Sequence, residues 1–588
     1  MIPRLSIRAA AATAAVGLAA AACGSSAGGS GAGGMGPGFD KASAQVLNAS
    51  TKTGGTINLI SSQTFDSIDP GVTYAGSTWN LYRTFARTMM AYQHSPGGNQ
   101  IVGDLATGPG VQSNGGKTWT YTLRDNATFE DGKTITSADV RWAIERANWS
   151  ALTGNGPTYF RNILTPPNDP RFKDLDVYKP GADKVFDTII VTTDPKKITF
   201  NLPQAFSEFD YVMTLLQTAP VERGADINSG DAYAKHPVAS GAYKISSYAP
   251  GKELKLVRND AYNAVSDPGH MHVALADVID VQLGVSAAER DQRLLTGQAD
   301  ADLGSALTVA NHAKVLQDAV LKSQADDAPD NSVAFASINT KLIPNVDCRQ
   351  AIEYGVDKGT VLNQLGGQWG GKIATNLLTA GIPGAQEFPT YDYDVPKAQA
   401  ALTKCKAEAP NLFGSDGKLS FKIAAQVNAP DLQNAATAIQ SSLAAVGIAT
   451  EVKLYPFGQY SQYCGNQDYS MVHKLGMCLA NWGPDWLTGY GMLDQWVTKN
   501  GIAATGSSNY AFLDDPVVND LEKHALASVE PTTQQQDWVK MDHRVMDLAA
   551  YVPLVQRHVM RFRSARLTNV MIDQAGGGGY DLSVLGLK

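Results

Sequence analysis

Residues 419–455, LSFKIAAQVNAPDLQNAATAIQSSLAAVGIATEVKLY, carry the pattern that decides the fold class. Residues 419–427 fit a strand, residues 432–446 repeat apolar side chains at helical spacing, and residues 449–455 fit a second strand. Gly447 is a suitable residue to end the helix. A strand, a helix and a strand in this order form a β-α-β unit, which is expected in a parallel sheet with a right-handed connection. The sequence therefore predicts an α/β protein.

The first half of the chain predicts mainly hairpins. Asp194-Pro195 and Pro250-Gly251 are each flanked by two short strand-like segments, as in a two-stranded hairpin. Residues 56–60 and 118–123 fit two further strands. Thr136 with Asp139 three positions later is close to a capping box and predicts the start of a helix.

Length and composition indicate a large globular protein. The chain has 588 residues, of which 44% are hydrophobic and 18% charged, a balance that suits two or three domains. The 48 Lys and Arg residues against 56 Asp and Glu residues give a formal charge of -8 without long runs of either sign. The sequence therefore lacks the basic surface expected of a nucleic-acid-binding protein.

The N-terminal stretch has the parts of an export signal. Arg4 and Arg8 precede an Ala-rich run that ends at Cys23 and is too short to cross a bilayer as a mature helix. Cys23 and the small residues around it resemble the lipobox of bacterial lipoproteins, in which the thiol carries a diacylglycerol. We expect residues 1–22 to be a signal peptide and residues 23–53 to be a lipid-anchored flexible tether. Ordinary cleavage with release of a secreted protein is the alternative.

The remaining cysteines predict a disulfide framework. After Cys23 the chain has an even number of cysteines, which allows three connectivities in an exported protein. We favour the pairs Cys348 with Cys405 and Cys464 with Cys478. Four buried free thiols are the alternative, because the sequence does not give the Cα separation that a disulfide needs. Zinc ligation is disfavoured, since no C-x-x-C spacing occurs.

Separated segments also carry a set of motifs in a fixed order. They are residues 115–125 (GGKTWTYTLRD), 129–132 (FEDG), 136–140 (TSADV), 241–244 (GAYK), 250–252 (PGK), 258–259 (RN), 348–352 (CRQAI), 356–358 (VDK), 481–486 (NWGPDW) and 551–554 (YVPL). The ordered set resembles the bacterial extracellular solute-binding proteins of family 5, the receptors of ABC importers for peptides, nickel and related solutes. The cysteine pairs resemble an actinobacterial lipoprotein variant of that family.

The resemblance implies a two-lobed periplasmic-binding-protein-like α/β fold of class II, large and with an extra subdomain in the first lobe. Lobe I is expected to comprise residues 54–297 and 530–588, with residues 105–239 as the accessory subdomain. Lobe II is expected to comprise residues 298–529. The two lobes of such a protein close on a ligand about a hinge.

The resemblance also points to a ligand site at the Trp-Gly-Pro-Asp-Trp segment. In peptide-binding relatives, an Asp at the position of Asp485 accepts the α-ammonium group of the ligand, and a carboxylate enclosed in a cleft needs such a cationic partner. The alternative is that the aromatic residues are core and that Asp485 caps a turn. For Tyr74, a role in a tight surface turn is an equal alternative. The candidate ligand-binding residues are Trp482, Gly483, Asp485, Trp486, Tyr490 and Tyr74.

The function expected from these features is capture of oligopeptides or dipeptides for an ABC permease. The resemblance implies a monomer without a cofactor at the outer face of the cell membrane. A receptor for a metal chelate or a carbohydrate on the same fold is the alternative, and an exported hydrolase is a further one. The chain lacks the H-E-x-x-H motif, and after residue 53 it lacks the G-x-S-x-G motif, of common hydrolases. His270 and His272 could ligate a metal, but an exposed loop is the other interpretation of this pair.

Overall fold

The computed structural model describes residues 41–95, 98–150, 156–166, 169–427, 429–503, 506–528, 530–573 and 579–588. The predicted signal peptide and the proposed lipidation site Cys23 lie outside these residues. Internal contacts separate residues Met1–Pro37 from residues Gly38–Lys588, and the architecture below is that of the second unit.

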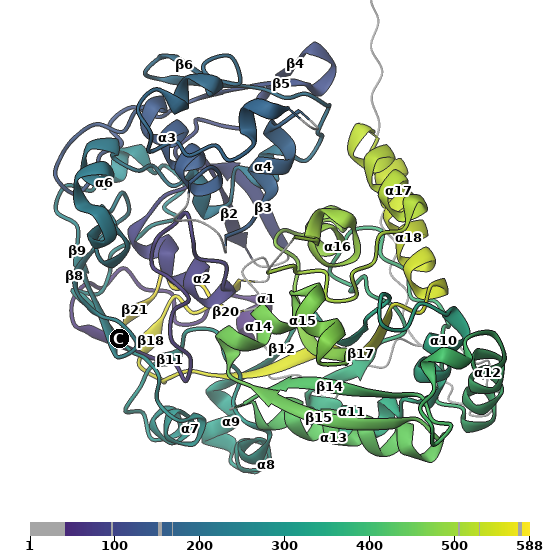
Figure 1. Cartoon of the computed structure of the whole chain (residues 1–588). Helices are drawn as coiled ribbons and strands as arrows, with labels where there is room; N and C mark the ends of the chain where they lie inside the picture. The colour runs from purple at the N-terminus through teal and green to yellow at the C-terminus, as the bar shows by residue number, and fades with distance from the viewer. Residues whose placement is uncertain are drawn as a thin grey trace, which may run out of the picture. The chain divides into compact units, whose positions relative to one another are not determined.

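A six-stranded sheet contains the β-α-β unit that the sequence predicts (Figure 1). Its strands, in spatial order, are β13 (Gly371–Ile373), β17 (Tyr551–Phe562), β12 (Ala325–Ile338), β16 (Leu475–Trp482), β14 (Ser420–Gln426) and β15 (Ala449–Tyr455). β14 and β15 pair in parallel and α13 (Pro430–Ala445) connects them, which confirms the prediction. Buried side chains of α13, including Ile439, pack against those of β14, including Ile423.

A five-stranded mixed sheet contains the first strand of the described chain. Its order is β11 (Ala301–Asp302), β1 (Thr56–Ile60), β10 (Val278–Gln282), β9 (Glu253–Arg258) and β8 (Tyr243–Ala249). β1 runs parallel to β10 and β11, whereas β8, β9 and β10 are antiparallel neighbours. The strand predicted at residues 56–60 and the hairpin predicted around Pro250-Gly251 are therefore confirmed.

A four-stranded antiparallel sheet holds the other predicted hairpin. Its order is β4 (Val111–Ser113), β5 (Thr118–Thr122), β7 (Lys197–Asn201) and β6 (Ile190–Asp194). Three two-stranded sheets pair β2 (Met90–Ser95) with β3 (Gly98–Gly103), β18 (Leu567–Thr568) with β21 (Gly586–Leu587), and β19 (Ile572–Asp573) with β20 (Gly579–Tyr580). The expected capping box opens α3 (Ser137–Asn148), where the Asp139 carboxylate accepts the Thr136 backbone N–H at 2.8 Å.

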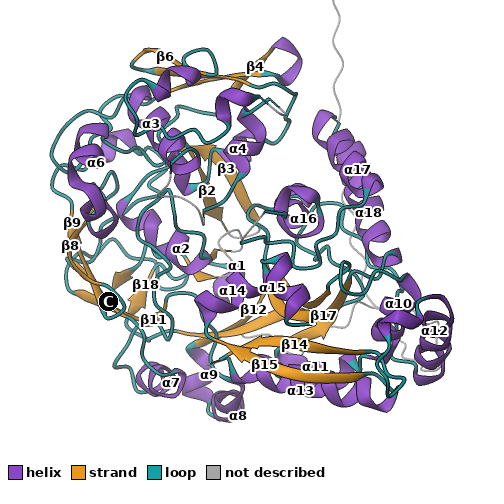
Figure 2. Cartoon of the chain, in the orientation of Figure 1, coloured by secondary structure: helices purple, strands orange, loops and turns teal. Residues whose placement is uncertain are grey.

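Helices cover the sheets and fill the space between them (Figure 2). The remaining α-helices are α1 (Lys41–Ala44), α2 (Gly76–Phe85), α4 (Tyr159–Leu164), α5 (Phe209–Val212), α6 (Arg223–Ser229), α7 (Ala287–Leu295), α8 (Val309–Gln317), α9 (Ala319–Ser323), α10 (Val346–Gly355), α11 (Lys358–Gln364), α12 (Val395–Glu408), α14 (Phe457–Cys464), α15 (Gln467–Val472), α16 (Gly489–Val497), α17 (Pro516–Ala527) and α18 (Pro531–Asp547). Asp515 before Pro516 predicts a capped helix with Val517, Val518, Leu521 and Leu526 inward. Asp515 does cap α17, but Val517 is exposed while its neighbour Val518 is buried. Adjacent positions point about 100° apart around a helix, so the two side chains cannot both face the same core.

The long strands β12 and β17 link the two larger sheets. Residues 325–329 pair with residues 558–562, and residues 333–337 pair with residues 551–556, with a shift of register between Pro329 and Val333. Beyond β17, Arg563 bridges to Ala301 of β11 in the five-stranded sheet. Residues 551–562 thus lie in the same sheet as β14 and β16, although the predicted lobe boundaries assign them to lobe I. Those boundaries stay a prediction.

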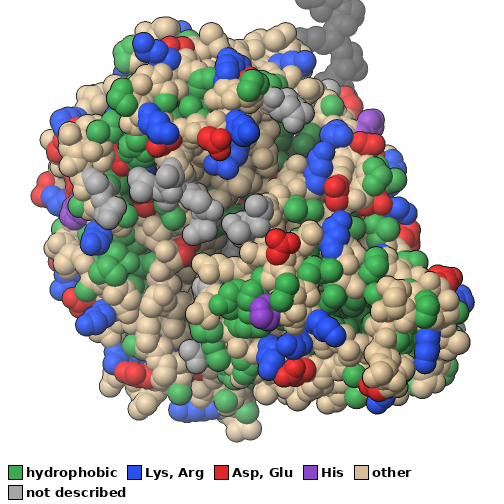
Figure 3. All heavy atoms as spheres, in the orientation of Figure 1, with side chains coloured by type: hydrophobic (Ala, Val, Ile, Leu, Met, Phe, Trp, Pro, Cys, Tyr) green, Lys and Arg blue, Asp and Glu red, His purple; other side chains and the backbone are tan. Residues whose placement is uncertain are grey.

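The structure contains both favoured disulfides. Cys348 of α10 is bonded to Cys405 of α12, and Cys464 of α14 is bonded to Cys478 of β16. None of the helices in the described residues is both long and apolar enough to cross a membrane. On the face shown in Figure 3, basic and acidic side chains are interspersed, in agreement with the mixed charge pattern of the sequence.

Candidate functional site

The segment that carries Asp485 is fixed between a central strand and a helix. It follows β16, which lies between β12 and β14, and it leads into α16. The backbone N–H of Asp485 donates to the carbonyl oxygen of Gly491 at 2.9 Å. A Cβ atom on Gly491 would come within 2.4 Å of the Trp486 carbonyl oxygen, so this turn requires glycine. The close packing holds the Asp485 carboxylate in one position.

Two tyrosines from distant parts of the chain contact this carboxylate. The hydroxyl group of Tyr74 donates to Asp485 Oδ2 at 2.6 Å, and the hydroxyl group of Tyr159 donates to the same oxygen. Tyr74 lies just before α2, where its backbone N–H donates to the Asp66 carboxylate at 2.6 Å. Tyr159 is the first residue of α4. Three oxygen-bearing side chains therefore converge at one point.

The electrostatic environment of Asp485 lacks a positive partner. Among the residues that the structure describes, no Lys, Arg or His side chain forms an ion pair with it. The pKa of Asp485 is raised to about 7, because burial and, to a smaller extent, the charge of Asp494 outweigh the lowering effect of the two tyrosine hydroxyl groups. A cation placed beside this carboxylate would offset the cost of its desolvation.

Asp485 lines a cavity that is open to solvent. Other lining residues are Trp79, Arg83, Tyr92, Thr214, His272 and Asp573. The aromatic rings of Trp79 and Tyr74 stack with their centroids 5.7 Å apart, which gives this end of the site a rigid apolar wall. A small organic cation with an apolar part fits the chemistry of this lining.

The tryptophans on the two sides of Asp485 lie in different environments. Trp482 is half-buried, its ring is edge-on to that of Tyr74 at 6.4 Å, and its Nε1 atom has no hydrogen-bond partner among the described residues. Trp486 and Tyr490 are buried in the hydrophobic core, where their rings lie against Tyr159. A direct ligand contact for Trp486 and Tyr490 stays a prediction, as it does for the half-buried Gly483.

Two residues of this site were absent from the sequence predictions. Besides Tyr159, the structure shows Glu208, whose carboxylate accepts the Trp486 indole N–H at 2.8 Å and the Thr488 hydroxyl at 2.6 Å. Burial raises the pKa of Glu208 to about 7. Neither residue belongs to a local motif, so only the three-dimensional structure reveals them.

The histidine pair does not form a shared site. His270 is exposed, whereas His272 is buried with Nδ1 2.8 Å from the Arg83 carbonyl oxygen and Nε2 3.0 Å from Asp104 Oδ2. Both ring nitrogens of His272 face acceptors, and the Asp104 charge raises the pKa of His272 against the effect of burial. In the described part of the chain, no group of three or more His, Cys, Asp or Glu side chains is arranged to hold a metal ion.

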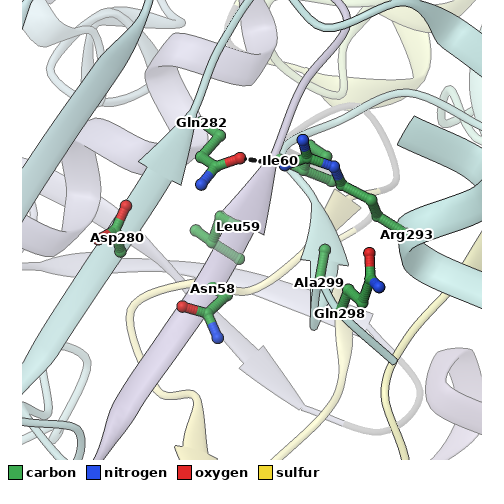
Figure 4. Close-up of a pocket in the computed structure, with 8 residues that line it drawn as sticks. All are labelled: Asn58, Leu59, Ile60, Asp280, Gln282, Arg293, Gln298 and Ala299. Carbon is green, nitrogen blue, oxygen red and sulfur yellow. Dashed lines mark hydrogen bonds between the residues drawn. The ribbon is translucent and has the colours of Figure 1, made fainter. Parts of the chain in front are cut away.

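A second cavity lies on the five-stranded sheet and contains none of the predicted site residues. It is lined mainly by polar side chains of β1, β10 and α7, and the Arg293 guanidinium group donates to the Gln282 side chain across it (Figure 4). Because the Arg293 guanidinium group already has a hydrogen-bond partner, this cavity is a weaker candidate for binding a charged ligand than the Asp485 cavity.

Comparisons with known proteins identify the family of the chain. Residues 100–504 match the model of the family described as bacterial extracellular solute-binding proteins, family 5 middle. The chain is 26% identical over 502 residues to the probable D,D-dipeptide-binding periplasmic protein of Escherichia coli strain K12, covering 84% of this chain and 86% of that protein. It is 22% identical over 475 residues to the glutathione-binding protein of the same strain, covering 80% and 83% of the two chains.

A solved structure is also closely similar. The chain superposes on the clavulanic acid biosynthesis oligopeptide binding protein 2 with a TM-score of 0.83 and 32% identity, covering 94% of this chain and 98% of that one. It superposes on the oligopeptide-binding protein of Listeria monocytogenes bound to peptide with a TM-score of 0.71 at 18% identity, covering 92% and 100%. The fold is therefore the two-lobed α/β fold of periplasmic peptide-binding proteins.

Proposed function

Because the chain belongs to the bacterial extracellular solute-binding proteins of family 5, we propose that it captures oligopeptides or dipeptides for an ABC importer. The relatives named above bind a D,D-dipeptide, glutathione or oligopeptides. These ligands are peptides, and this shared chemistry supports a peptide as the ligand of this chain.

The observation that carries the proposal is the set of oxygens around Asp485. A primary ammonium group has three N–H donors, and the Asp485 carboxylate with the hydroxyl groups of Tyr74 and Tyr159 offers three acceptors within hydrogen-bond reach of one another. The carboxylate supplies the negative charge that an ammonium ion needs in a partly buried site. In this proposal the free amino terminus of a peptide binds between these three side chains.

The long strands β12 and β17 are the proposed hinge. They connect the two larger sheets, and the shift of register between Pro329 and Val333 is a point where the strands can bend. Asp485 lies on the β16 side of this connection, while Tyr74 and Tyr159 lie in segments that precede it in the chain. The hydroxyl groups already contact the carboxylate in this structure, so bending at the hinge would separate them to admit the ligand and bring them back around it.

We also propose that Cys23 anchors the protein to the outer face of the cell membrane. The lipobox-like residues around Cys23 support this, and the Gly- and Ser-rich residues 24–38 would act as a tether, because from Lys41 onward the chain packs on the folded unit, where the Ala42 N–H donates to Asp326 and Leu47 bridges to Val570. The protein would act as a monomer and without catalysis, as a receptor that delivers its ligand.

Thermal unfolding with sets of ligands tests the function. A ligand at about 100 times its dissociation constant stabilises the folded state by about 2.7 kcal/mol, so peptides with free amino termini should raise the melting temperature. Sugars and metal ions, each added without peptide, should leave the melting temperature unchanged. The proposal fails if sugars or metal ions shift the melting temperature and no peptide does, and turnover of a peptide without a shift would favour the hydrolase.

The Asp485→Ala variant tests the role of the carboxylate. It should weaken binding of peptides with free amino termini by 2 kcal/mol or more, on the order of the cost of removing one partner of a buried charge pair. N-acetylated peptides, which lack the ammonium group, should lose much less. Glu145→Gln, a change on α3 away from the cavity, is the matched control and should leave both affinities unchanged. Equal losses for both peptide types with Asp485→Ala would exclude the ammonium role.

A further inference from the structure

We propose that binding of a cationic ligand at Asp485 is coupled to release of a proton from the Asp485 carboxyl group. The inference rests on the proposed function, because it takes the ligand to bring a positive charge to this residue. It adds a regulatory property, namely that capture weakens as the medium becomes acidic.

Four acidic side chains gather around the site, and the charge of Lys499 offsets only part of the effect of burial and Asp494 on one of them, Glu522. They are Asp485, Glu208, Asp494 and Glu522, and among the described residues none of the four forms an ion pair. Their partners are neutral donors, such as the Trp486 indole and the Thr488 hydroxyl for Glu208. Glu208, Asp494 and Glu522 are at most 4% exposed. Burial of this much uncompensated negative charge is unfavourable, so protonation of part of the cluster is expected.

A single amide group joins the two deepest acids. Asn500 Nδ2 lies 2.8 Å from Asp494 Oδ1 and 3.1 Å from Glu522 Oε2, so one neutral side chain serves two carboxyl groups. The pKa of Glu522 is raised well above its ordinary value, first by burial and then by Asp494. The charge of Asp494 thus raises the pKa of both neighbouring acids, Glu522 and Asp485.

The positive groups in the cavity already have partners. Arg83 donates to Asp573 at 2.7 Å and lies 3.5 Å from Asp581. His272 pairs with Asp104 at 3.0 Å. The groups that interact with Asp485 itself are the hydroxyl groups of Tyr74 and Tyr159 and the acid Asp494, so none of them can balance its charge.

A ligand ammonium group would supply the missing positive charge. With a pKa of about 7, the Asp485 carboxyl is partly protonated near neutral pH. When the ammonium group arrives, the O–H bond of the carboxyl breaks, the proton passes to the solvent, and the carboxylate keeps the electron pair and binds the cation. Ligand binding and proton release are then linked, and the observed affinity depends on the fraction of ionised carboxyl.

Calorimetric titration tests this coupling. The probe is the free-amine peptide that gives the largest melting shift in the screen described above. Between about pH 5.5 and about pH 7.0 the peptide amine stays mostly protonated, because α-amino groups have pKa values of about 7.7 to 8.0. Over this range the affinity should rise about 15-fold as Asp485 ionises. At about pH 7, binding heats in buffers of different ionisation enthalpy should show release of about half a proton.

Three variants assign the proton. Asp485→Asn should bind the peptide more weakly and lose most of the pH dependence. Glu208→Gln removes the other group beside the site with a pKa of about 7, and the pH dependence should remain. Glu145→Gln is the matched control, since the pKa of Glu145 is also raised to about 7 but its carboxylate pairs with Arg141 on α3.

The outcomes separate the coupling from the function. Peptide binding without pH dependence or proton release would overturn the coupling and leave the proposed function in place. A pH dependence that survives in Asp485→Asn, or that disappears in Glu208→Gln, would also overturn it. Absence of a melting shift with every peptide would instead refute the proposed function.

Discussion

The β14-α13-β15 unit and the Asp485 site form in different ways. The first is a run of 36 residues, from Ser420 to Tyr455, in which each element contacts the next one along the chain. The second brings together Tyr74, Tyr159 and Asp485, and the hydrogen bonds that join them span 411 and 326 positions of the sequence. Local patterns can specify the first region, whereas the second exists only once the whole chain has folded.

Energetically the two regions also differ. The β-α-β unit is held by apolar burial, which tolerates loss of a few contacts. The site region depends on buried charges, because Arg146 of α3 binds both oxygens of Asp69 at 2.6 and 2.7 Å, and Asp226 at 3.0 Å. Asp69 lies in the segment that leads to Tyr74. Damage to the ion pairs should therefore affect ligand binding as well as stability.

The largest expected effect is that of Arg146→Ala. This change leaves the carboxylates of Asp69 and Asp226, both at most 3% exposed, without their cation and should lower the free energy of unfolding by about 3–5 kcal/mol. Denaturant unfolding measures the loss, and the peptide titration should show weaker binding. Arg171→Ala, which breaks an exposed pair with Asp169, is the control and should change neither quantity. If folded Arg146→Ala binds the peptide with full affinity, the ion pairs of Arg146 stabilise the fold but do not position the ligand site.

A smaller effect is expected from Ile423→Ala in β14. Ile423 is fully buried, so the substitution should lower the free energy of unfolding by about 3 kcal/mol through lost burial and the cavity that remains. Peptide affinity should stay at the wild-type value below the unfolding transition. If Ile423→Ala lowers the peptide affinity as much as Arg146→Ala does, the β-α-β unit and the Asp485 site are not independent of each other.

The smallest effect has the opposite sign. Because the folded-state pKa of Asp485 is raised to about 7, its contribution to stability is present below the unfolded pKa of about 3.9 and is lost as the pH rises through about 7. At about pH 8, Asp485→Asn should therefore raise the stability of the ligand-free protein, by about 1 kcal/mol, since the open cavity screens part of the charge. At about pH 4 the two proteins should be equally stable. Thermal unfolding of both proteins at both pH values measures this difference. Equal stability of the two proteins at about pH 8 would contradict the raised pKa of Asp485.

The sequence predictions succeeded where the signal is local. The strand at residues 56–60, the capping box at Thr136 and both disulfide pairs agree with the structure. The inward position expected for Val517 was wrong, because Val517 and the buried Val518 are adjacent positions that point about 100° apart around the helix. The importance of Asp485 could be expected from the resemblance of its motif, but its partners could not.

By itself, the sequence determined the α/β class, the order of strands and helices around the β-α-β unit, and the segment that carries the candidate carboxylate. The class and the order of elements depend on periodicity, turn residues and helix caps, which act over a few neighbouring positions, whereas the carboxylate segment was identified from the family resemblance of its motif. The tertiary structure decided that Tyr74 and Tyr159 contact Asp485, that Glu208 accepts the Trp486 indole N–H, and that no described cation forms an ion pair with Asp485. Such contacts depend on which distant segments pack together, and the burial that they create sets the pKa of each acid.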